Sequence, residues 1–112
     1  MGHDDRLSLE QMLDTVRRVR RLVRGVPRDG FEDNEVLQLA VVHLIQVLGE
    51  AASRVSAGLR ERHPELPWAE MIGMRNHIVH GYDHLDPDIA WRVATEDLEV
   101  VLAALDRMLA TG

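Results

Sequence analysis

The residues of this chain that are best suited to chemistry lie in one short stretch, Met74 to Tyr82. An arginine, an amide, two histidines and a phenol occur there: Arg75, Asn76, His77, His80 and Tyr82. Arginine can hold a phosphate and the charge that develops on it, and histidine, whose ordinary pKa is near neutrality, can donate or accept a proton. The set therefore suits an anionic substrate that is cleaved by proton transfer.

RNA cleavage is a reaction that these side chains fit. The ribose 2′-OH can attack its own phosphate once its proton is removed, so one histidine acting as base and one as acid suffice without a metal ion. On a straight helix, however, His80 points about 140° away from Arg75. Either the helix ends near Gly81 and swings His80 round, or a second copy of the chain completes the site by two-fold symmetry.

A metal site is the competing interpretation of the same stretch. Three histidines have ligand-like spacing close to three aspartates: His77, His80 and His84, with Asp83, Asp86 and Asp88. It is less favoured, because His84 lies beyond Gly81 and no Glu-x-x-His pattern is present. Taken singly, His77 and His84 also fit as exposed histidines, and His80 as a capping or core histidine. We therefore expect neither a metal nor another cofactor.

Arg75 interrupts an apolar face of the helix predicted around it. The apolar residues of this face recur at helical spacing: Trp68, Met71, Ile72, Met74, Ile78, Val79 and Tyr82. A guanidinium in such a place needs a carboxylate, a ligand anion or an interface, because an unpaired buried charge is costly. Glu50 lies in an apolar run and is the first candidate to neutralise Arg75, although it fits equally well as an exposed helix glutamate.

Length and composition indicate a single domain over residues 1–112, long enough to bury one core. The chain has no cysteine, which agrees with a reducing cytoplasm. Neither a signal peptide nor a run of about 18 consecutive apolar residues is present, so we expect a soluble cytoplasmic protein that does not enter a membrane. The net charge of −6 argues against coating nucleic acid by bulk electrostatics but leaves room for a local basic cleft.

Helical periodicity extends over most of the chain, and no stretch has the period of a strand. The first predicted helix runs from Leu9 to Arg24 with Ser8 as its N-cap, and the second runs from an Asp33 cap to about Ala57. A third helix is predicted from Trp68 to about His80. From Pro87 onward the pattern fits either one bent helix or two helices, the second of which would restart at Thr95. We predict an all-α antiparallel bundle of four or five helices. The second helix is too apolar for one buried face, which favours either a central position or a homodimer.

The central stretch, written Arg75-Asn76-x3-His80-x-Tyr82, resembles the Arg-x4-His-x-Tyr signature of HepT-like toxins in the HEPN superfamily. Three flanking stretches are similar to the same family: 48–52 to its second-helix signature, 63–68 to the run before its third helix, and Trp91 with Asp97-Leu98 to its C-terminal pattern. The resemblance spans nearly the whole chain. It implies a homodimeric helical bundle that cleaves RNA without a metal, with Arg75, Asn76 and His80 as the catalytic residues.

The resemblance also implies a partner. In this family the toxin is paired with a minimal nucleotidyltransferase antitoxin that adenylylates the tyrosine of the signature, which is Tyr82 in this chain. We accordingly interpret the chain as the endoribonuclease toxin of a toxin–antitoxin pair, with Glu50 and His77 in supporting positions. The alternative is a non-catalytic helical module that binds a nucleotide or a partner and is associated with a nucleotidyltransferase.

Overall fold

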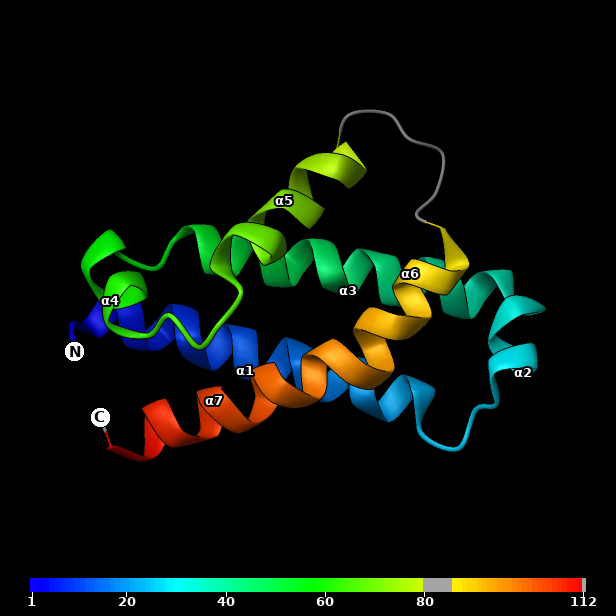
Figure 1. The fold of residues 1–112 in the computed structure, drawn as a ribbon, viewed down its shortest axis with the longest axis horizontal. Helices are drawn as coiled ribbons and strands as arrows, with labels where there is room; N and C mark the ends of the chain where they lie inside the picture. The colour runs from blue at the N-terminus through cyan, green and yellow to red at the C-terminus, as the bar shows by residue number, and fades with distance from the viewer. Residues whose placement is uncertain (80–85, 112) are drawn as a thin grey trace.

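Four long helical segments run back and forth along the molecule, and successive segments run in opposite directions (Figure 1). The computed structural model describes residues 1–79 and 86–111, without the side chains of 76–79 and 111. Over those residues the elements are α1 (His3–Val23), α2 (Arg28–Glu32), α3 (Glu35–Ser53), α4 (Ala57–Arg62), α5 (Trp68–Val79), α6 (Pro87–Arg92), the π-helical turn η1 (Val93–Asp97) and α7 (Leu98–Thr111), with no strand. The predicted all-α bundle is confirmed.

Helix α3 lies in the middle of the bundle and packs against α1 on one side and α5 on the other. Its buried residues, which include Val41, Ile45 and Leu48, belong to the same hydrophobic core as the buried face of α1. This central position accounts for the apolar residues that α3 buries on two sides, whereas Val36 and Leu39 of the same helix remain exposed. By length and composition α3 could also cross a membrane, a test that core helices of soluble proteins pass too.

Helix α1 begins six residues earlier than the sequence pattern predicted. Its N-cap is Gly2, and Ser8, the expected cap, lies buried inside the helix. The expected start followed the apolar face, which begins at Leu9, whereas the preceding turns are polar and are stabilised by acids near the N-terminus such as Asp4. The end of α1 near Arg24 is confirmed, since Gly25 adopts φ of +73° and the chain turns there.

Two stretches between the predicted long helices each contain a short helix. Helix α2 buries Phe31, whose ring lies 5.2 Å from that of Trp91. Helix α3 starts after Asn34, which accepts a hydrogen bond from the Leu37 N–H at 3.0 Å, so Asp33 is not the cap. It ends at Ser53 rather than near Ala57, because Ser56 caps the separate helix α4.

Ser56 also ties this break to the start of α1. The carboxylate of Asp5 accepts hydrogen bonds from the Ser56 backbone N–H at 2.9 Å and from its hydroxyl at 2.7 Å. These two bonds lower the pKa of Asp5, because they favour the ionised carboxylate. The break between α3 and α4 is therefore fixed by a tertiary contact across 51 residues of sequence.

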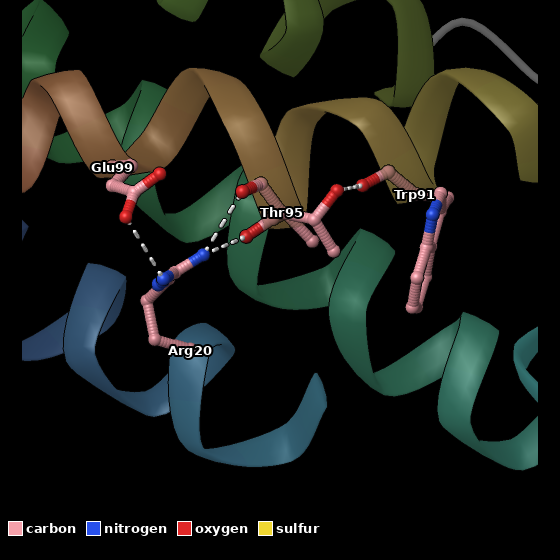
Figure 2. A network of polar contacts seen from close by, with 5 residues as sticks. Arg20, Trp91, Thr95 and Glu99 are labelled. Atoms are coloured by element: carbon pink, nitrogen blue, oxygen red, sulfur yellow. Dashed lines mark hydrogen bonds and ion pairs between the residues drawn. The ribbon is translucent and has the colours of Figure 1, made fainter. Parts of the chain in front are cut away.

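The C-terminal segment is one continuous helical run with a π turn in it. Its first residue is Pro87, as predicted, and the side chain of Asp86 caps it by accepting a hydrogen bond from the Asp88 N–H. Figure 2 shows the contacts that hold the turn: the Nη1 atom of Arg20, in α1, donates to the backbone oxygens of Ala94 and Thr95 at 3.3 and 3.1 Å. The Thr95 hydroxyl donates to the Trp91 carbonyl at 2.7 Å, so Thr95 bridges back within the helix and does not start a new one. A π turn disturbs the regular carbonyl pairing, and Arg20 supplies donors there.

Candidate functional site

Arg75 lies on α5 where this helix crosses α3. Its Nη1 atom is 3.4 Å from a carboxylate oxygen of Glu50 and 3.2 Å from the hydroxyl oxygen of Ser53. The predicted pairing of Arg75 with Glu50 is therefore formed. The Arg75 side chain is 27% exposed and that of Glu50 is 48% exposed, so the pair lies at the edge of the bundle, where an anion from solvent can reach it.

Ser53 is the contact that the sequence reasoning missed. Its hydroxyl donates to the backbone carbonyl of Glu50 at 2.6 Å, which directs its acceptor side toward the guanidinium. Ser53 follows Glu50 by three residues and so lies on the neighbouring part of the helix surface. That spacing is the signal by which it could have been found.

Gly49 permits the close approach of α5 to α3. A Cβ atom added at Gly49 would lie 2.5 Å from the Met71 carbonyl oxygen and 2.9 Å from Cβ of Arg75. The first neighbour is backbone and cannot move without shifting α5. The depth at which Arg75 is held against α3 therefore depends on a glycine at this position.

The remaining predicted residues are placed only in part. Asn76 and His77 follow Arg75 on the backbone of α5, and their side chains are not described. His80, Tyr82 and His84 lie outside the described residues, so their roles, and the alternative of a histidine metal site, stay predictions. Within the part of the chain that is described, no group of three or more His, Cys, Asp or Glu residues is arranged to hold a metal.

Comparison with known proteins agrees with the family that the motif resembles. The family model described as "Ribonuclease HepT-like" matches residues 12–108. This chain belongs to the HepT-like ribonuclease family. The resemblance stated from the motif is thus confirmed at the level of the family, and the matched region contains the whole stretch from Arg75 to Tyr82.

Relatives of this HepT-like chain carry names that agree. A "Putative RNase" of Methanocaldococcus jannaschii is 28% identical over 95 residues, which cover 85% of this chain and 87% of that protein. The "Probable ribonuclease HepT" of Thermococcus cleftensis is 25% identical over 100 residues, which cover 89% and 91% of the two chains. No solved structure matches the chain.

The packing at Gly49 gives a first testable prediction. Gly49→Ala in this HepT-like chain should lower the free energy of unfolding by about 1–3 kcal/mol, because the methyl group collides with the backbone of α5. Urea denaturation followed by circular dichroism measures this change.

Gly73→Ala is the matched control. It lies on α5 itself, and an added Cβ would meet nothing within 4 Å. Alanine there should leave stability unchanged or raise it by up to about 1 kcal/mol, since alanine is the better helix former. Equal effects of the two substitutions would show that the crossing at Gly49 is not tight.

Proposed function

We propose that this HepT-like protein is a metal-independent endoribonuclease whose catalytic residues are Arg75, Asn76 and His80. The observation that carries the proposal is the partly exposed guanidinium of Arg75, held by Glu50 and Ser53 at the arginine position of the Arg-x4-His-x-Tyr pattern. Membership of a ribonuclease family supports the choice of RNA as substrate.

In the proposed reaction a histidine accepts the proton of the ribose 2′-OH, and the 2′-oxygen attacks the adjacent phosphorus. The bond from phosphorus to the 5′-oxygen breaks, and that oxygen takes a proton from a second histidine. The products are a 2′,3′-cyclic phosphate and a 5′-hydroxyl. Arg75 binds the phosphate and stabilises its developing charge, and Asn76 orients the substrate or His80. The proposed role of His77 is a supporting one.

Glu50 gives this site a built-in competitor for the phosphate. Its carboxylate neutralises Arg75 in the free protein, and its exposure lets water take over its solvation when a phosphate replaces it at the guanidinium. The pair with Glu50 therefore leaves Arg75 without an uncompensated charge until a phosphate binds.

The proposal includes a homodimer, in which two-fold symmetry brings two His80 residues to one cleft. Helix α3 offers a surface for it: Val36 and Leu39 are 78% and 53% exposed, and helical spacing places them on the same face as Glu50. Light scattering at micromolar concentration should report a dimer, and Leu39→Arg should yield a monomer with impaired cleavage. A wild-type protein that is monomeric under these conditions would refute the composite cleft.

We further propose that the protein acts in the cytoplasm as the toxin of a toxin–antitoxin pair and that its antitoxin is a minimal nucleotidyltransferase. Transfer of AMP to Tyr82 would place a phosphodiester charge and a nucleotide two residues from His80. The tethered anion would compete with RNA phosphate for Arg75. The modification would thereby switch the nuclease off.

Co-expression with a neighbouring nucleotidyltransferase tests this regulation. Intact-mass spectrometry should show AMP-sized additions that disappear in Tyr82→Phe, and the modified protein should cleave RNA more slowly. Additions that map to another residue, or unchanged cleavage after modification, would exclude Tyr82 as the switch.

The nuclease activity itself is tested with purified protein and labelled RNA in excess EDTA. We expect cleavage that persists in EDTA and leaves 2′,3′-cyclic phosphate ends. An intact RNA would favour the alternative of a non-catalytic binding module, and cleavage that requires zinc would reject the mechanism.

A further inference from the structure

A groove of about 570 Å³ lies between α5 and the C-terminal run, with α3 at its base. We refer to it as the α5–α7 groove. Its lining is mainly apolar and includes Met71 and Met74 of α5 and Val100 of α7, the last of which is 61% exposed. A groove of this volume falls within the range of about 300–1,000 Å³ that is usual for binding sites, which are mostly lined by apolar side chains.

The charged residues that line the α5–α7 groove are all acidic, although His63 and Arg107 lie close enough to Glu65 to lower its pKa. Three carboxylates line it, those of Glu65, Glu70 and Asp97, and among its described lining residues there is no arginine or histidine. Glu65 contacts His63 at 3.3 Å, whereas Glu70 and Asp97 form no ion pair within the described part of the chain. The groove therefore combines an apolar floor with an acidic rim.

The apolar floor and the acidic rim together indicate which class of ligand the groove can bind. RNA and nucleotides would be repelled, because their phosphates would face three carboxylates. A symmetric contact with the same groove of a second copy would bring two acidic rims and two concave surfaces together, which matches neither in charge nor in shape. A ligand with apolar side chains on one face and cations on both flanks would complement both the apolar floor and the acidic rim of the groove.

We propose that the α5–α7 groove binds an amphipathic helix of a partner protein, with leucine- or methionine-like side chains on one face and lysine or arginine on its flanks. Helices commonly bind grooves through apolar residues spaced three and four apart. The two methionines favour this occupant, since their unbranched, polarisable side chains adapt to the surface of a bound helix. The proposal does not depend on the ribonuclease reaction.

The probe for this proposal is a synthetic amphipathic helix of about four turns with leucines on one face and lysines on both flanks. Fluorescence anisotropy of the labelled peptide should show saturable binding that weakens as salt is raised. The same peptide with glutamates in place of the lysines should not bind. Equal binding of the two peptides, or binding of neither, would overturn the proposal.

Protein variants locate the binding surface. Val100→Arg should weaken binding of the lysine peptide by about tenfold or more, because it puts a cation at the apolar contact. Glu70→Gln combined with Asp97→Asn should weaken it and reduce its salt dependence. Leu7→Arg, on an exposed apolar residue of α1 away from the groove, is the matched control and should bind as the wild type does.

Circular dichroism confirms that each variant is folded, which is expected because Val100 and Leu7 are both exposed. Identical peptide affinity of Val100→Arg and Leu7→Arg would place the peptide elsewhere and reject the groove. Loss of self-association in Val100→Arg would likewise reject a separate partner, since it would identify a second copy of this chain as the occupant.

Discussion

Replacing Arg75 by alanine is expected to slow RNA cleavage by about 10²–10³-fold, the usual cost of losing one donor to a developing phosphate or oxyanion charge. Arg75→Lys should recover only part of the rate, because an ammonium keeps the charge but lacks the planar pair of donors. Initial rates on a labelled RNA in excess EDTA, with enzyme in excess over RNA, measure both effects.

Arg17→Ala is the matched control for Arg75→Ala. Arg17 is an exposed arginine on α1 that pairs with Asp106 at 3.1 Å, and exposed ion pairs of this kind add little to stability. The control should cleave at the wild-type rate. If Arg75→Ala is folded by circular dichroism and still cleaves as fast as Arg17→Ala, Arg75 is not the phosphate-binding residue.

Replacing His80 by alanine is expected to slow cleavage by about 10²–10⁴-fold, the usual contribution of a general acid or base. The loss should appear at every pH at which the wild type is active, since no other group is proposed to move the proton. His3→Ala, an exposed histidine at the start of α1, should leave the rate unchanged. A contaminating nuclease would be insensitive to His80→Ala, and so would an enzyme that uses another base.

Helical periodicity was a reliable guide to the fold wherever apolar residues face a core. It predicted the long helices, and the preference of proline for the first turn of a helix predicted the start of α6 at Pro87. It failed where tertiary contacts decide. The break after Ser53 depends on the bond from Ser56 to Asp5, and the π turn depends on Arg20, contacts that join residues more than 50 positions apart. The spacing of apolar residues along the chain does not predict such long-range contacts.

Of the predicted site, the structure describes only the side-chain surroundings of Arg75. A charge within an apolar face required a partner, and that argument led from Arg75 to Glu50, which the structure places in contact. It did not lead to Ser53, because a helical serine commonly bonds only to the backbone of its own helix and then needs no tertiary partner. Nor did it predict that position 49 requires glycine. A side chain there is excluded by the backbone of α5, and this contact exists only when the two helices are packed together.

The most direct test of the proposed chemistry uses an RNA that carries a single 2′-deoxynucleotide at the mapped cleavage position. In excess EDTA, the wild-type protein should cleave the all-ribose strand and leave the substituted strand intact, because the attacking 2′-OH has been removed. Cleavage of the substituted strand at the same position would contradict the account, since a water molecule rather than the ribose would then be the nucleophile.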